Sequence, residues 1–348
     1  MNFLSFFFGR RPKSETSSLA ARPVAPTPTR SSEAAINEGR WTDAQLKFLA
    51  TFLRGGECPK DEGSYWTKVL GQSPSRSAQR LMGAGLLESA STAAKLDSAF
   101  KATEIKVMLR ERGLTVSGKK ADGIARLVTA DPSGMDAKVA QISAYMCTET
   151  GRTLAEHYVN REAERKRSAR ARSLEFLCAG KLRQAAVVAA EYEASQVFPR
   201  GLGVDWNQRP SPEDVQKLER ILNARPAILK DVALDEWAPL QRAAAMMELW
   251  GERSGREWLP EGFVGASNLD VDTSIRMVLF AGDHQAKLEQ YRSSGCARVE
   301  VSGCGEDSCP VCKKMNGKKY RVNQVPELPH PQCTHEMGCR CMLLPVFD

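Results

Sequence analysis

The sequence contains no apolar run long enough to cross a membrane. Its most apolar stretch, MNFLSFFF at the N-terminus, has eight residues, whereas a transmembrane helix needs about 20. The positive charges follow this stretch, but a secretory signal carries them in front of a longer apolar run. The sequence therefore predicts no transmembrane segment. The stretch is interpreted as a docking tail or a disordered end, with a weak membrane-surface anchor as the alternative.

Residue patterns that carry catalysis are also scarce. The 348-residue chain has four histidines. It shows no phosphate-cradling glycine-rich loop, no Ser–His–Asp set and no paired carboxylates that stand out. This scarcity favours a non-enzymatic protein over an enzyme.

The ten cysteines are unevenly spread, because six lie between Cys304 and Cys341 and the other four are scattered. A secreted disulfide scaffold is short and dense in cysteine throughout. The distribution therefore predicts a reducing, cytoplasmic location. It also points to the last tenth of the chain as the place where the thiols act together.

What the sequence has in abundance is helix-forming residues, including Glu, Arg, Ala and Lys. The net charge of +7 is compatible with a polyanionic partner. The sequence predicts a mainly α, multi-domain protein. Its expected parts are a disordered tail and linker (1–38), a helical segment (39–96), a small helical module (97–132), two helical regions (133–200 and 201–272) and a cysteine-rich domain (273–348).

Two of these parts have competing interpretations. Within 39–96, the stretch SPSRSAQRLMGAGLLES resembles the helix–turn–GLL layout of small winged-helix-like modules, with a plain helical subdomain as the alternative. Residues 161–172 hold six Arg or Lys and two Glu. We interpret them as an exposed helix with pairs such as Glu162–Lys166, in preference to a nucleic-acid-binding stripe.

Residues 100–130, FKATEIKVMLRERGLTVSGKKADGIARLVTA, predict a helix that ends at Gly113, an extended link and a second helix from Lys119. This stretch resembles the SAP domain, a short helix–extended–helix module that binds DNA. The matching residues are Ile105, Lys106, Leu109, Arg112, Gly113, Leu114, Val116, Ser117, Gly118, Lys119, Lys120, Ile124, Arg126 and Leu127. Gly123 departs from the pattern, because the family usually has an apolar residue there, and it is expected to loosen the second helix.

The start of that second helix has the chemistry of a phosphate site. It offers unpaired backbone N–H groups and the positive end of the helix dipole. The residues expected to bind DNA are Ser117, Gly118, Lys119, Lys120 and Arg126. Such contacts position a protein on DNA but read little sequence, so weak, salt-sensitive binding of duplex DNA is expected. The alternative is a solvated helix start in a protein-interaction module.

The cysteine-rich end begins with CPVCKKMNGKKY and closes with GCRC, residues 338–341. Zinc takes four ligands in a tetrahedron, commonly as two pairs from separate loops. The expected ligands are Cys309, Cys312, Cys339 and Cys341, with His330, Cys333 and His335 as alternates. Alternate residues of a strand point in opposite directions. This leaves open that one cysteine of GCRC faces away and that Cys333 or His330 completes the set.

This end of the chain, about residues 273–346, also resembles the C-terminal part of the phage Mu F-like head-morphogenesis family. The matching residues are Cys309, Pro310, Cys312, Gly317, Lys318, Tyr320, Pro329, His330, Cys339, Arg340 and Cys341. The resemblance implies a structural role in a phage or prophage, with protein–protein contacts to capsid components. An insertion between the histidine and the last cysteines leaves open whether His330 or His335 is the family histidine.

Together these observations predict a helix–extended–helix SAP-like module and a small α+β zinc-binding C-terminal domain. The favoured function is non-enzymatic association with duplex DNA. Two alternatives stay open. One is the head-morphogenesis role, and the other is a zinc-dependent hydrolase that would use a carboxylate near the cysteines, such as Glu306, Asp307 or Glu336.

Overall fold

The computed structural model describes residues 39–62, 64–198, 210, 212–263, 269–303 and 305–346. The tail predicted at 1–38 lies outside this range. The chain divides into the units 1–41 and 42–348, and the second unit is described here. The expected mainly helical fold with a small α+β end is confirmed. Its α-helices are α2 (Asp43–Ala50), α3 (Tyr65–Leu70), α4 (Pro74–Gly83), α5 (Thr92–Ala99), α6 (Ala102–Glu111), α7 (Lys120–Ala130), α8 (Pro132–Val139), α9 (Glu149–Cys178), α10 (Leu182–Ala194), α11 (Pro212–Asn223), α12 (Trp237–Trp250), α13 (Val271–Ser293) and α14 (Pro310–Met315).

Two small antiparallel sheets accompany the helices. Their strands are β1 (Gly56–Glu57), β2 (Leu87–Ser89), β3 (Ala144–Cys147), β4 (Arg298–Ser302), β5 (Lys319–Arg321) and β6 (Met342–Val346). The first sheet has the order β1-β3-β2 and the second has the order β5-β4-β6. Among the helices described above, none is long and apolar enough to cross a membrane.

The first sheet is built around an insertion. Strands β2 and β3 pair with each other, with Leu87 opposite Cys147, yet the whole of α5–α8 lies between them in sequence. The helix before the sheet, α2, starts with a capping box in which Thr42 and Gln45 exchange hydrogen bonds. Its buried Phe48 contacts Trp66 of α3 edge to face, with 5.1 Å between the ring centroids. These contacts hold α2 and α3 together.

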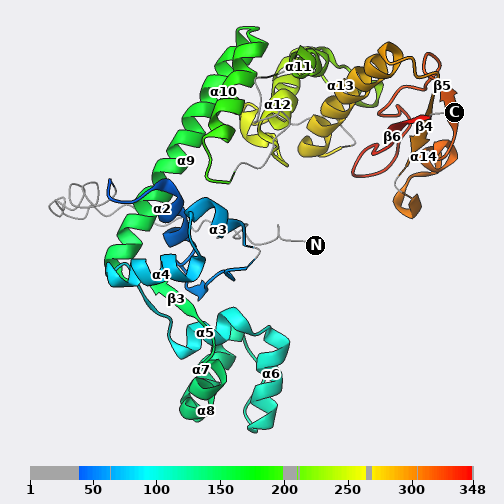
Figure 1. Ribbon diagram of the computed structural model, residues 1–348. Coiled ribbons are helices and arrows are strands. Elements are labelled where there is room, and N and C mark those ends of the chain that lie inside the picture. The colour runs from blue at the N-terminus through cyan, green and yellow to red at the C-terminus, as the bar shows by residue number, and fades with distance from the viewer. Residues whose placement is uncertain are drawn as a thin grey trace, which may run out of the picture. The chain divides into compact units, whose positions relative to one another are not determined.

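Helices α5–α8 form a compact module (Figure 1) with its own apolar core. Ile105 and Leu109 of α6 pack against Leu127 of α7, and all three side chains are at most 1% exposed. Gly123 lies in this contact. A Cβ there would stand 3.1 Å from Leu109 Cδ1 and 3.2 Å from Ile105 Cγ2. Helix α7 is continuous through this position, and the glycine lets α6 and α7 approach closely. The expectation that Gly123 loosens α7 stays a prediction.

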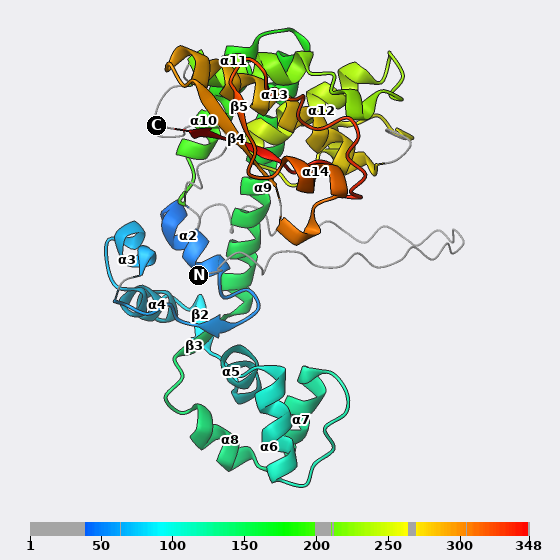
Figure 2. The same ribbon diagram turned by 90° about the vertical axis from the view of Figure 1, so that its right-hand side faces the viewer.

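The C-terminal domain follows the long helix α13. Strand β4 pairs with both β5 and β6, and Figure 2 shows β4 and β5 with α14 nearby. Val299 and Val301 of β4 are fully buried, as the alternation in the sequence predicts. The hydroxyl of Tyr291 in α13 donates to the Leu343 carbonyl of β6 at 3.2 Å. The sheet is thus attached to the helix that precedes it.

Candidate metal centre

Three segments bring five cysteines together in the C-terminal domain. Cys309 is the N-cap of α14, and Cys312 lies in the first turn of that helix. Cys333 belongs to the loop between β5 and β6, and Cys339 and Cys341 close that loop just before β6 begins at Met342. The C-x2-C spacing therefore acts at a helix start, where residues three apart face the same side of the first turn.

A glycine lets this loop approach α13. Gly338 has a φ of +71°, and a Cβ there would stand 2.6 Å from Met277 Cε and 2.7 Å from Met277 Sδ. A side chain at this position would require the end of the Met277 side chain to move, and the positive φ also disfavours any residue other than glycine. Cys339 is the next residue in this tightly packed loop.

The distances between the sulfurs match those around a metal ion. Sγ of Cys333 lies 3.7 Å from Sγ of Cys309 and 3.8 Å from Sγ of Cys312, and Cys312 Sγ lies 3.9 Å from Cys339 Sγ. A disulfide needs about 2.05 Å, and all five cysteines are free. Four sulfurs each about 2.3 Å from a zinc ion lie about 3.8 Å apart.

The five thiols form two groups that could each hold a metal ion. One contains Cys309, Cys312 and Cys333, and the other contains Cys312, Cys339 and Cys341. Both groups share Cys312, which is 3% exposed, while Cys339 is fully buried. The cavity between the groups has a volume of about 10 Å³, roughly what one water molecule requires.

The thiols influence one another's ionisation. Burial raises the pKa of Cys309, but backbone N–H groups that donate to its sulfur, first that of Cys312, outweigh burial and lower the pKa to about 7. The Cys333 and Cys341 thiols donate to Cys339 and lower its pKa. Burial, followed by the charge of Cys339, raises the pKa of Cys312 to about 12. A cation among them is what would allow further thiols to ionise.

Both cysteines of GCRC belong to one group, and neither faces away. The period-2 alternation applies only within a strand, and β6 starts after Cys341. The two histidines lie outside the sulfur groups. His330 Nδ1 accepts from the Gln332 N–H at 3.1 Å, and His335 Nε2 lies 3.1 Å from the Arg340 guanidinium. The structure thus gathers Cys333 with the predicted thiols, but not His330 or His335.

Sequence reasoning missed a third histidine near this loop. His284 of α13 is 5% exposed, and burial lowers its pKa below the usual range. Its ring donates to the Leu328 carbonyl, while its Nδ1 has no hydrogen-bond partner among the described atoms. The sequence could have indicated its burial, because His284 lies two turns after Met277 on the buried side of α13. Its contact with Leu328 ties the ligand-bearing loop to α13.

The residues predicted to bind DNA lie around the start of α7, but several are engaged. Lys120 Nζ forms an ion pair with Asp97 at 3.0 Å. Arg126 donates to the Ser117 carbonyl, and the Lys119 N–H donates to Asp122 Oδ2 at 3.0 Å. The start of the helix is therefore capped from within the protein. The Lys119 and Ser117 side chains are exposed, so they are what this site offers to a ligand.

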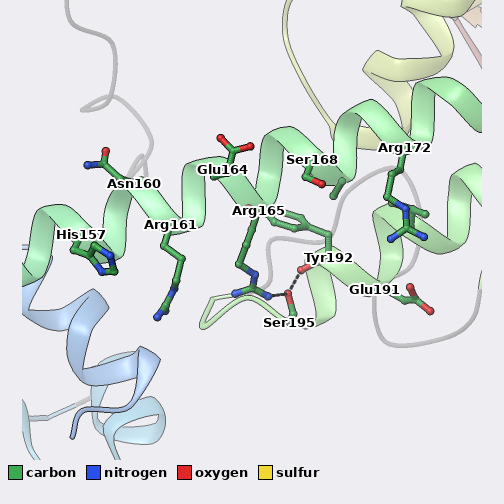
Figure 3. A pocket seen from close by; sticks show the side chains of 12 residues that line it. His157, Asn160, Arg161, Glu164, Arg165, Ser168, Arg172, Glu191, Tyr192 and Ser195 are labelled. Carbon is green, nitrogen blue, oxygen red and sulfur yellow. Dashed lines mark hydrogen bonds between the residues drawn. The ribbon is translucent and has the colours of Figure 1, made fainter. Parts of the chain in front are cut away.

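The basic run at 161–172 is part of an ion-pair network, as the sequence favoured. Five of its six basic residues have a carboxylate partner. The partners differ from the expected Glu162–Lys166 pair, because Lys166 reaches Glu252 at the end of α12 and Glu162 pairs with Arg165. A groove between α9 and α10 (Figure 3) is lined by part of this run, and Arg165 there donates to Ser195 Oγ at 3.1 Å. Three of these pairs join α9 to residues outside it, Asp43, Glu252 and Glu257.

No protein-family model matches the chain, and no curated protein matches it significantly.

Proposed function

We propose that the protein is a non-enzymatic, duplex-DNA-associated protein whose C-terminal domain is closed by a structural zinc ion. The observation that carries the zinc proposal is three Sγ–Sγ distances of 3.7, 3.8 and 3.9 Å, each close to one of the six edges of a zinc–thiolate tetrahedron, about 3.8 Å. The four sulfurs that they join come from the two groups that share Cys312, so a single ion would draw the two groups together. Those three distances join Cys309, Cys312, Cys333 and Cys339, which we propose as the ligands. Cys341 is then the fifth, non-ligating thiol.

A pair of serine variants tests this ligand set. Cys333→Ser removes a ligand, so the purified protein should lose most of its zinc. Cys341→Ser is the matched control, also a thiol of this cluster, and should keep one zinc per chain. Native mass spectrometry of the full chain measures both. Zinc retained in Cys333→Ser and lost in Cys341→Ser would reverse the assignment, and a wild type without metal would remove the proposal.

The DNA proposal rests on the SAP-like pattern and on the exposed Lys119. The module from Ser91 to Ala140 carries nine basic and six acidic residues. Lys120 is paired with Asp97, and Arg126 donates to the Ser117 carbonyl in the link between α6 and α7. Both side chains are therefore engaged within the module. Lys119 is then the charge that meets a DNA phosphate. One phosphate contact adds about one unit to the salt dependence of binding and carries no sequence preference.

Salt titrations of duplex binding test this role. Lys119→Glu should weaken binding to all sequences and lower the slope of log affinity against log salt by about one. Lys230→Glu, which makes the same charge change at another exposed lysine, should have a smaller effect that is independent of the module. A duplex affinity that changes neither with salt concentration nor in Lys119→Glu would contradict the proposal.

A structural role in virion assembly is the second candidate, and the edge strand β6 favours it. Met342 and Leu344 on this strand are 53% and 45% exposed, and exposed apolar side chains on a sheet edge suit contact with another protein. The candidate predicts that the full chain cosediments with capsid-like assemblies and that Leu344→Glu abolishes this. Wild-type protein that stays in the supernatant would exclude it.

A further inference from the structure

The N-terminal sheet and its helices have a characteristic order. Along the chain the elements run α2, β1, α3, α4, β2 and β3, and the sheet order is β1-β3-β2 with both pairings antiparallel. Helices α3 and α4 are joined by the three residues Gly71, Gln72 and Ser73, with Gly71 at φ +67°. A short turn that contains glycine is typical of a helix-turn-helix. The same succession of helices and strands defines the winged-helix arrangement.

From this topology we infer that α4 is a recognition helix that enters the major groove of duplex DNA. The partner is the one already named in the proposed function, but the inference rests on α4 and not on Lys119. The second helix of a helix-turn-helix is the one that reads base edges. Helix α4 has ten residues, and an α-helix with its side chains is about 10–12 Å across, which fits the major groove of about 12 Å.

The two faces of α4 have different chemistry. The face toward the protein holds Pro74, Ser77, Ala78 and Leu81, all buried. The opposite face holds Arg76, Gln79, Arg80 and Gly83, all exposed. Spacings of three and four residues place these side chains in one row along the helix. The helix contains no acidic residue, so its charge complements a polyanion.

The exposed side chains are also the types that read bases. Arginine binds the O6 and N7 of guanine in a bidentate manner, and glutamine does the same for N6 and N7 of adenine. Within the described part of the chain, the side chains of Arg76 and Gln79 have no hydrogen-bond or ion-pair partner. Two N–H groups at the start of α4 are already taken, because Asp61 Oδ1 accepts from the Ser75 N–H at 2.9 Å and Ser73 Oγ accepts from the Arg76 N–H at 3.3 Å. Recognition therefore depends on the side chains.

The connection between β2 and β3 is where a winged helix has its wing, which flanks the recognition helix. Here that connection carries α5–α8 with Lys119. Helix α5 contacts both β1 and β3. The inference therefore assigns two kinds of contact to one duplex: base readout by α4 and a phosphate contact from the inserted module.

Selection of binding sites from random duplexes, followed by affinity titration at fixed salt, tests this with the zinc-loaded full chain. The wild type should select a preferred sequence. The Arg76→Ala/Gln79→Ala variant should lose roughly 5- to 150-fold in affinity for that sequence, the effect of losing a bidentate base contact, with little change on unrelated DNA. Arg172→Ala, an exposed arginine on α9, is the matched control. Unchanged thermal unfolding would show that both variants fold.

The outcomes separate this inference from the phosphate contact. If Lys119→Glu weakens binding but the α4 variant retains the wild-type preference, the recognition helix is wrong and the phosphate contact stands. If only the α4 variant weakens binding, the recognition helix stands and the phosphate contact of Lys119 is wrong. A wild type that selects no sequence would overturn the inference, and one that binds no duplex would overturn both.

Discussion

The α5–α8 module and the C-terminal domain are both small, but their cores differ in composition. The module is closed by aliphatic side chains and two methionines, with Leu96 and Leu127 fully buried. The C-terminal domain buries a few valines and leucines together with five cysteines, and Cys333 is half-buried beside them. Its strands have three to five residues. Small domains of this kind often need a metal or a disulfide to supplement the core. The module has an apolar core alone, whereas the C-terminal domain adds a cysteine cluster that could hold a metal ion.

Removing a central thiol should have the largest effect. Cys312 belongs to both sulfur groups, so Cys312→Ser should prevent metal binding and unfold the C-terminal domain, since structural zinc contributes about 10–16 kcal/mol in small zinc-binding domains. Hydrogen exchange followed by mass spectrometry should show fast exchange in β4–β6 and unchanged exchange in α5–α8. Protected amides in β4–β6 of the variant would mean that the domain does not depend on the metal.

A cavity in the core of the α5–α8 module should destabilise the module and leave the C-terminal domain unchanged. Leu127 is fully buried between α6 and α7, so Leu127→Ala should cost about 2–5 kcal/mol of unfolding free energy. Exchange should speed up in α5–α8 while the zinc content stays at the wild-type value. A simultaneous loss of zinc would show that the two regions unfold together and that the comparison between them fails.

A methyl group added at the α6–α7 contact should have a smaller effect. In Gly123→Ala, the new Cβ would approach Leu109 Cδ1 to 3.1 Å, and the cost of overpacking, about 1–3 kcal/mol, exceeds the gain in helix propensity of up to about 1 kcal/mol. A net loss of about 1 kcal/mol is expected in the opening free energy of α7 amides. A more stable α7 would mean that the contact has room for a side chain.

The smallest effect concerns the ion pair at the end of α7. Arg112 donates two hydrogen bonds to Asp131, at 2.9 and 2.8 Å, and this lowers the pKa of Asp131 below 3.8. The unfolded chain then takes up a proton first as the pH falls, so the contribution of Asp131 is present above its ordinary pKa and is lost below it. NMR signals of α7 in the wild type should melt earlier at pH 3 than at pH 5, by more than in Asp131→Asn. Equal shifts in both would assign the pH effect to other groups.

Local patterns in the sequence predicted much of the fold. The glycine after α6, the alternating Val299 and Val301 and the C-x2-C spacing each specify a short-range structure. They placed the helices of the module, the buried face of β4 and the start of the cysteine cluster. These signals come from backbone geometry and from hydrophobic periodicity, so they need no knowledge of distant contacts.

Long-range contacts were not predictable in the same way. The pairing of β2 with β3 spans the whole α5–α8 insertion, and nothing local indicates that the two strands meet. The role of Gly123 depends on how closely α6 approaches α7, and the gathering of Cys333 with Cys312 depends on the path of a loop. The buried His284 followed the apolar face of α13, but its contact with Leu328 could not be read from spacing.

The most direct test of the metal-closed C-terminal domain is zinc K-edge X-ray absorption on the full-length protein. One zinc per chain with four sulfur neighbours at about 2.3 Å is expected. A protein without zinc, or a zinc surrounded mainly by nitrogen and oxygen at about 2.0–2.1 Å, would contradict it.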